Sequence, residues 1–148
     1  MKLSTKLGIV AIVAVTGIAG VALTQENIPS SSLPAGNVNF GPTGVKTEVG
    51  ELKAGPAYGD LGKGRHGTFI RMPAKFVSPL HNHTADYFGI VIQGVGVNSQ
   101  PGNAEVPLPV GSYWFQKGKE NHVTKCISDT DCLFFIYQGD KFDYVPAK

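Results

Sequence analysis

The residues of this chain best suited to chemistry are two histidines separated by a single residue, His81 and His83. In a β-strand, residues i and i+2 point to the same face, so the two imidazoles would converge on one side. Imidazoles at that spacing can take two adjacent positions around one metal ion. The alternative for so short a pattern is two polar side chains at a strand end. The elements around the pair decide between these interpretations.

The segments that must position these histidines are short β-rich runs. From about residue 45 onwards no helical period of apolar residues is sustained, and Gly, Pro, Asn and Asp punctuate the chain. Runs of this length and spacing predict an all-β sandwich or small barrel. The expected strands are Val45–Leu52, Gly67–Met72, Phe76–Leu80, Tyr87–Gln93, Val95–Asn98, Gly111–Gln116, His122–Ile127, Cys132–Tyr137 and Phe142–Val145.

Two of these runs, 88–92 and 133–137, are continuously apolar. This pattern predicts that both faces of each strand are covered. Two stacked sheets leave one face of each sheet outward, so we expect a homodimer to cover it.

The N-terminus predicts a signal peptide over residues 1–24. A short basic stretch precedes the uncharged run Leu7–Leu23, and the small residues around Ala22 suit signal peptidase. The alternative is an uncleaved anchor, for which the run is at the low edge of a spanning length. In either case we expect the rest of the chain outside the cytoplasm, periplasmic or secreted. Residues 25–44, rich in Pro, Ser, Gly and Asn, predict an extended arm, and residues 45–148 a single domain.

The charge of the mature chain is balanced. Lys2 and Lys6 fall in the leader, so 11 basic side chains remain against 11 acidic ones. This balance argues against nucleic acid and anionic lipid as partners. Cys126 and Cys132 are close in sequence, and an even pair in an oxidising compartment predicts a disulfide. The alternative is two small buried apolar residues on neighbouring strands.

The layout of the histidines resembles the cupin superfamily. The first cupin motif runs Gly-x5-His-x-His-x3/4-Glu-x6-Gly, and the second runs Gly-x5-Pro-x-Gly-x2-His-x3-Asn. His81, His83 and Gly94 match the first motif. Gly111 and His122 match the second.

Two stretches narrow this resemblance. Leu80–Tyr87 and Gly111–Gln116 look like the small bacterial cupins of the DUF4437 group, related to anti-sigma-factor cupins of the ChrR type. The resemblance covers about residues 45–145. It implies one double-stranded β-helix, or jelly-roll, barrel with a metal site formed by His81, His83 and His122.

The chain departs from the cupin pattern at informative positions. Lys75 replaces the opening glycine of the first motif, and the glutamate position falls on Tyr87 or Phe88. Cys126 replaces the final asparagine of the second motif. Asp86 is the nearest carboxylate; it could be a fourth ligand or hydrogen-bond a ligand imidazole.

Three histidines without a glutamate resemble the sites of acetylacetone dioxygenase and cysteine dioxygenase. Such a trio leaves positions open for substrate and dioxygen on Fe(II); Zn, Mn and Ni are the other candidate ions. We therefore expect an exported metal-binding cupin, a non-haem oxygenase acting on a small, largely apolar substrate, with Tyr87 or Asp86 orienting a reactant. The alternative is a non-catalytic ligand- or metal-sensing module, as the ChrR resemblance implies. A third option is an exported carrier of metal or small molecules.

Three further side chains have a place in this interpretation. Tyr87 and Trp114 could line an apolar cavity beside the metal, although aromatics on strands are more often plain core. His66 lies among Gly and basic residues, and we expect it in a turn or at the surface.

Overall fold

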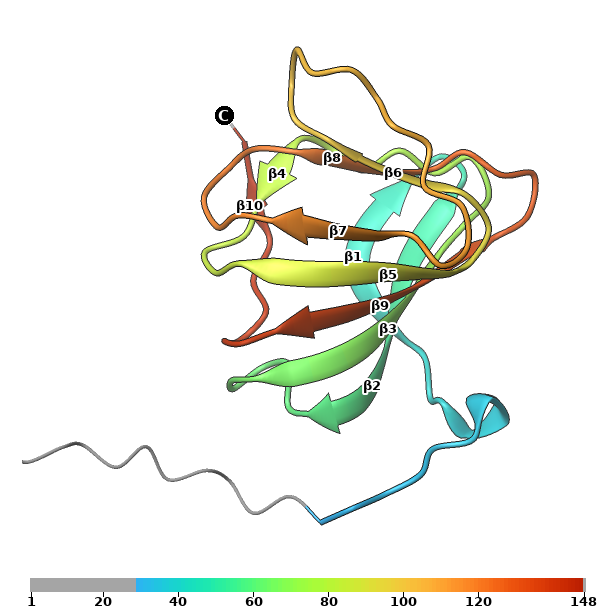
Figure 1. Cartoon of the computed structure of the whole chain (residues 1–148), viewed down its shortest axis with the longest axis vertical. Helices are drawn as coiled ribbons and strands as arrows, with labels where there is room; N and C mark the ends of the chain where they lie inside the picture. The colour runs from blue at the N-terminus through green and yellow to red at the C-terminus, as the bar shows by residue number, and fades with distance from the viewer. Residues whose placement is uncertain (1–28, 148) are drawn as a thin grey trace, which may run out of the picture.

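The computed structural model describes residues 29–147, which are almost entirely β (Figure 1). The one helical turn in this range is a 3-10 helix, η1 (Ala35–Asn37). The strands are β1 (Gly41–Thr47), β2 (Gly50–Gly59), β3 (His66–Met72), β4 (His81–Asn82), β5 (Tyr87–Gln93), β6 (Gly96–Ser99), β7 (Tyr113–Gln116), β8 (Val123–Cys126), β9 (Cys132–Gln138) and β10 (Val145–Pro146). The predicted all-β class is confirmed.

The strands form one large antiparallel sheet and two small ones. The large sheet has the order β1-β2-β3-β9-β5-β7, and the pairs β6-β8 and β10-β4 make the small sheets. In Figure 1 the large sheet curves round so that β1 lies behind β5. The small sheets lie on the concave side, and together they enclose the interior.

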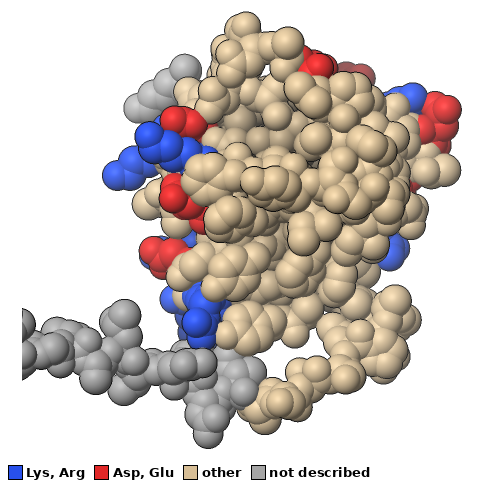
Figure 2. All heavy atoms as spheres, viewed as in Figure 1, with Lys and Arg blue, Asp and Glu red and all other residues tan. Residues whose placement is uncertain are grey.

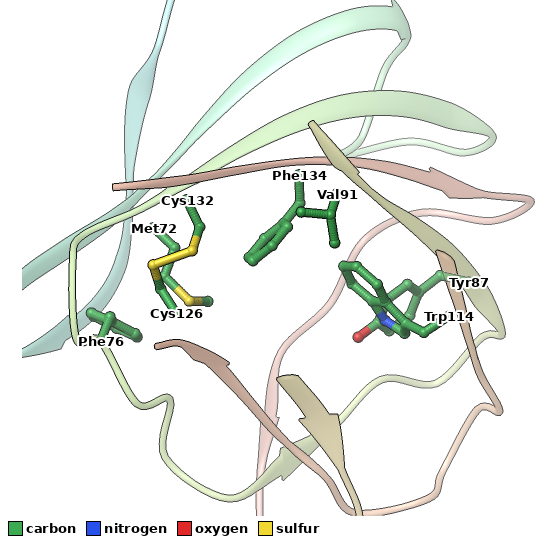
Figure 3. Packing of buried hydrophobic residues seen from close by; sticks show 8 residues of the cluster. All are labelled: Met72, Phe76, Tyr87, Val91, Trp114, Cys126, Cys132 and Phe134. Atoms are coloured by element: carbon green, nitrogen blue, oxygen red, sulfur yellow. A yellow bond between two sulfur atoms is a disulfide. The ribbon is translucent and has the colours of Figure 1, made fainter. Parts of the chain in front are cut away.

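The interior changes from polar to apolar along the barrel. At the end where β9 finishes, four directly paired residues of neighbouring strands are buried and polar or phenolic: Gln116, Tyr87, Gln138 and His66. The opposite end holds the buried Met72 and Phe76 beside the disulfide, with Phe134 and Val91 between the two ends (Figure 3). Any polar ligand would therefore be held at the first end.

The disulfide predicted for Cys126 and Cys132 is present. Both cysteines are fully buried in the apolar end of the core. The bond joins the end of β8 to the start of β9, which a short loop connects. It therefore fixes the point where the chain returns from the small sheet to the large one.

Gly89 allows an indole to lie flat inside the barrel. A Cβ atom at this position would lie 2.2 Å from Cζ2 of Trp114, its partner on β7. Only a glycine leaves that space. Trp114 in turn packs edge-on against Tyr87, with the ring centroids 6.4 Å apart.

Three expected strands differ from those in the structure. The run Val45–Leu52 is not one strand, because the chain turns at residues 48–49 and pairs β1 with β2. The run Phe76–Leu80 has only a single bridge, at Val77; Lys75, at φ 61°, and the flanking prolines interrupt an extended course. The run Phe142–Val145 is a strand only from Val145, where β10 begins its pairing with β4.

The described part of the arm, residues 29–40, covers the outside of β2. Gly55 leaves room for Val38 and Phe40, because a Cβ there would lie 2.4 Å from a Val38 methyl carbon. The guanidinium of Arg71 lies 4.3 Å from the centre of the Phe40 ring. The predicted signal peptide, residues 1–24, lies outside the described residues. Within residues 29–147 no helix is long and apolar enough to cross a membrane.

Candidate metal centre

Three histidines converge at the polar end of the barrel. His81 begins β4, His83 follows that strand, and His122 directly precedes β8. The backbones of His81 and His122 form an antiparallel bridge with N–H to carbonyl distances of 3.1 and 2.8 Å. One ring nitrogen from each of the three histidines lies within 4.8 Å of the others. The cluster is therefore compact enough to hold one metal ion.

The second nitrogen of each ring has a backbone partner. The Nδ1 of His81 donates to the carbonyl of Pro79 at 2.8 Å, and that of His122 to the carbonyl of Glu120 at 3.1 Å. The Nδ1 of His83 donates to the carbonyl of Asp143. A carbonyl only accepts, so each Nδ1 carries the proton and each Nε2 presents a lone pair. These fixed tautomers are the ones that metal-bound histidines adopt.

Burial keeps these imidazoles neutral. The three side chains are only 0–6% exposed. Loss of solvation lowers the pKa of His81 and that of His122 to about 4, and it also lowers the pKa of His83. Neutral imidazole is the form that binds metal. The cluster is thus ready for an ion at neutral pH.

The same burial predicts acid sensitivity of the metal-free protein. Unfolded histidines gain protons below about pH 6.5, whereas folded His81 and His122 resist until about pH 4. We expect the free energy of unfolding to be highest above pH 6.5. By pH 5 it should fall by about 1–2 kcal/mol for each residue. Urea denaturation from pH 7.5 to 5 checks this, and a flat profile would contradict it, because the shifted carboxyl groups titrate below this window.

Tyr87 reaches the cluster from β5. Its hydroxyl lies 3.2 Å from Nε2 of His122, the nitrogen that faces the other rings. Burial raises the pKa of Tyr87 to about 12, so the phenol stays protonated. In this geometry the hydroxyl donates to His122. If that nitrogen binds an ion instead, the phenol proton is free for another acceptor.

A cavity of about 530 Å³ opens beside the histidines. Its lining includes His81, His83 and Tyr87, and apolar side chains from the large sheet such as Leu52, Ile70 and Ile136. No Asp, Glu, Lys or Arg of the described residues is among those that line it. The cavity therefore suits a small, mainly apolar molecule.

Comparison with known families decides the relationship that the motifs indicate. Residues 39–148 match the family described as "Domain of unknown function (DUF4437)". This chain belongs to the DUF4437 family. No curated protein matches it significantly.

Solved structures place the DUF4437 fold among the cupins. An RmlC-like cupin protein from Ralstonia eutropha is 17% identical, with 80% of this chain and 74% of that chain covered and a TM-score of 0.62. A predicted oxalate decarboxylase from Thermotoga maritima is 19% identical, with 74% and 99% covered and a TM-score of 0.61. The polyketide cyclase RemF from Streptomyces resistomycificus is 14% identical, with 81% and 87% covered and a TM-score of 0.66. At these identities the likeness establishes the cupin barrel and nothing about chemistry.

Asp86 takes part in the turn before His122. Its Oδ1 accepts a hydrogen bond from the backbone N–H of Gly118 at 2.7 Å and so holds the turn before His122. It belongs to no cluster with the histidines. Among the described residues, the structure shows no contact of Asp86 with a ligand imidazole, and its predicted roles stay predictions. Because side chains alternate along a strand, Asp86 is expected on the face opposite to Tyr87.

His66 is not in a surface turn. It is 1% exposed and begins β3, with its ring 2.9 Å from the Thr68 hydroxyl and 3.2 Å from the Gln138 amide oxygen. That oxygen only accepts, so Nε2 of His66 carries the proton and Nδ1 accepts from Thr68. The prediction failed because the residues next to His66 in sequence do not reveal its burial. That burial depends on pairing with β9, which is far along the chain.

Sequence reasoning missed the strap that covers the histidines, residues 142–146. Besides accepting from His83 through its carbonyl, Asp143 binds the N–H and hydroxyl of Thr84 through its carboxylate. The ring of Tyr144 stacks on His81, with the centroids 4.4 Å apart and the planes 19° apart. No sequence motif predicts these contacts, because about 60 residues separate the partners.

The hydrogen bonds of the strap to His83 and Thr84 lead us to expect that it affects metal affinity. Asp143→Ala removes the anchor to Thr84 and frees the carbonyl that orients His83. We expect metal affinity to fall about 10-fold, the lower end of what loss of such partners costs. Competition with a chromophoric chelator measures it. Asp140→Ala is the control, because among the described residues that exposed carboxylate bonds to the adjacent backbone N–H and to no ligand or strap residue beside the histidines. Equal affinities in both variants would refute the role of the strap.

Proposed function

We propose that this DUF4437 cupin binds one divalent transition metal through His81, His83 and His122 and acts on a small organic substrate in the adjoining cavity. The observation that carries the proposal is the arrangement of the rings. Three buried, neutral imidazoles direct their free nitrogens at one another, and each is fixed by a hydrogen bond from its other nitrogen. The Nε2 atoms of the three rings are close enough to bind one ion, and that of His122 accepts a hydrogen bond from Tyr87 when no ion is bound.

The type of ligand atom limits which metal ions would bind at this site. An all-imidazole site suits Fe, Zn, Cu and Ni, with hard-oxygen ions such as Mg disfavoured. Among these we favour Fe(II), as in the three-histidine dioxygenases that the motifs resemble, with Zn or Ni as the other candidates. Mn, also expected from the sequence, suits this donor set less well because it prefers oxygen ligands. Three protein ligands leave open positions, so the ion would supply Lewis acidity and a template for the substrate.

The chain itself would bind and orient the substrate. The apolar lining excludes water, and the phenol of Tyr87 donates a hydrogen bond beside the ion. Proteins named as a polyketide cyclase and a predicted oxalate decarboxylase have a similar barrel, so the fold is compatible with an enzyme. The resemblance to three-histidine oxygenases favours oxygen chemistry among such activities.

Oxygen consumption tests the enzymatic proposal. The Fe(II)-loaded protein is supplied with β-dicarbonyl and thiol compounds in air, and a Tyr87→Phe variant is assayed beside it. We expect substrate-dependent oxygen uptake by the natural protein and slower uptake by the variant. Tight binding of a test compound without uptake would instead favour the non-catalytic sensing module.

We also propose that the protein is exported after removal of residues 1–24. The buried disulfide between Cys126 and Cys132 supports this location, because such bonds form and persist in oxidising compartments. Fractionation of cells followed by intact-mass measurement tests it. A periplasmic or secreted chain starting near residue 23 or 25 is the expected result, and a full-length cytoplasmic chain would overturn it.

We further propose that a second copy of this chain covers the outer face of β5, β7 and β9. Six apolar side chains point outward there and are 40–64% exposed: Phe88, Ile90, Ile92, Tyr113, Phe115 and Tyr137. Figure 2 shows charged side chains at the edges of this face and none in its middle. An uncharged face is compatible with itself under two-fold symmetry. With roughly 100 Å² exposed on each side chain, a symmetric pair would bury about 1,200 Å², the area of a stable interface.

Sedimentation velocity tests this pairing. We expect a dimer for the natural chain and a monomer for Ile90→Glu, which places a charge on the central strand of the face. Val106→Glu is the matched control, because Val106 is 63% exposed in the loop between β6 and β7. A monomeric natural chain, or a dimer unaffected by Ile90→Glu, would overturn the proposal.

A further inference from the structure

The cavity beside the histidines extends along the strands of the large sheet. Every second residue of β3 lines it: His66, Thr68, Ile70 and Met72. Side chains two residues apart on a strand point to the same face and lie about 6.6–6.8 Å apart, so these four span about 20 Å. The neighbouring strands β2 and β9 line the cavity in the same alternating way, through Leu52, Ala54, Pro56, Phe134, Ile136 and Gln138. The cavity is therefore elongated along the strands.

The metal centre lies at one end of this cavity. Tyr87, whose hydroxyl reaches the histidine cluster, pairs with Gln138 on β9, and Gln138 pairs with His66 on β3. The cluster is thus level with the first residue of the β3 series. Met72, the last residue of that series, lies beside the disulfide, at the end of the core opposite to Tyr87 (Figure 3). A molecule bound at the metal centre would extend from there towards Met72.

The wall between these two ends is apolar, and no described part of the chain fills the space in front of it. Four of its side chains pack against the core but are only partly buried: Val45, Leu52, Ile70 and Ile136. Covering such surface with an apolar group is favourable. A second charge on a ligand would stay unpaired, because no charged side chain of the described residues lines the cavity. The wall therefore suits an uncharged, apolar chain.

We propose that the substrate is an amphiphile, with one polar head at the metal centre and an apolar tail of several carbons that lies along β2, β3 and β9. This inference rests on the proposed function and names its substrate class. Leu52, Ile70 and Ile136 set the preference for the tail, because their accessible apolar surface faces it. The volume of about 530 Å³ falls within the range of pockets that enclose whole organic ligands.

Binding of alkyl hydroxamates to the zinc-loaded full chain tests this proposal. These probes share one metal-binding head and differ only in tail length, from acetohydroxamate to octanohydroxamate. We expect affinity, measured by calorimetry, to rise about two- to fourfold for each added methylene group, because each one leaves water for the apolar wall. Octanohydroxamate should bind the His81→Ala/His83→Ala variant more weakly than the natural chain, because its head finds no ion there.

Two substitutions in the wall separate the tail from the head. Ala54 lines the cavity and pairs with Ile70 on β3, so Ala54→Phe takes space from the tail. We expect octanohydroxamate affinity to fall at least about 10-fold, the effect of two or three methylene groups, with acetohydroxamate and zinc affinities unchanged. Ile70→Thr keeps the size of the side chain and makes it more polar, and it should lower octanohydroxamate affinity about threefold. Ala104→Phe, in the exposed loop between β6 and β7, is the matched control and should change none of these values.

Each contrary outcome overturns the proposal in a distinct way. Affinities that do not depend on tail length would show that the apolar wall holds no tail. Equal binding of octanohydroxamate to the natural chain and to the His81→Ala/His83→Ala variant would place the head away from the metal centre. Unchanged octanohydroxamate affinity in Ala54→Phe and Ile70→Thr would place the tail elsewhere. Failure of the proposed function is seen separately, as absence of bound zinc in the natural chain.

Discussion

Replacing His122 with alanine is expected to lower metal affinity by more than 100-fold. His122 is fully buried, and its Nε2 faces the other two imidazoles. Its loss removes a ligand, which costs more than the roughly 10–100-fold effect of losing an outer partner. Within residues 29–147 no carboxylate belongs to the cluster and could substitute for it. Chelator competition with zinc or Co(II) measures the change.

His66→Gln is the matched control for that experiment. His66 is also a buried histidine, but it bonds to Thr68 and Gln138 and takes no part in the cluster. Metal affinity should be the same in this variant as in the natural chain. Equal losses in the two variants would show that general destabilisation, rather than ligation, lowers the affinity.

Removing the disulfide is expected to lower the free energy of unfolding by about 2 kcal/mol. The bond joins residues only six apart, so it restricts the unfolded chain less than a bridge across a long loop would. The Cys126→Ser/Cys132→Ser variant also places two hydroxyls in the apolar end of the core, which adds to the loss. Urea denaturation of the metal-free protein measures the difference.

A reducing agent separates these two contributions. It should destabilise the natural chain and leave the double-serine variant unchanged, because only the former has a bond to break. A natural chain that is equally stable with and without reductant would contradict the predicted contribution. The comparison also bears on export, since the bond would be lost in a reducing cytoplasm.

Much of the fold follows from local sequence. The continuously apolar runs in β5 and β9 predict their strands because apolar, β-branched and aromatic residues pack well inside a barrel. The course of Phe76–Leu80 does not follow from such signals. Its residues favour a strand, but the positive φ at Lys75 and the backbone bridge between His81 and His122 give the segment an irregular path.

The candidate site was predictable in part. The spacing of His81 and His83, with the cupin motifs, predicts the convergence with His122 that the structure shows. Metal binding by these residues stays a prediction. The strap with Tyr144 and the burial of His66 depend on contacts between residues distant in sequence, which leave no periodic signal.

The most direct test of this account is the metal content of the mature protein, purified without chelator or affinity metal. We predict about one transition-metal ion per chain, lost in a His81→Ala/His83→Ala variant that remains folded by circular dichroism. Iron would make oxygen chemistry the leading activity, whereas zinc, nickel or manganese would keep the site and weaken that link. Absence of stoichiometric metal from the natural protein, even after incubation with Fe(II) or zinc, would contradict the account.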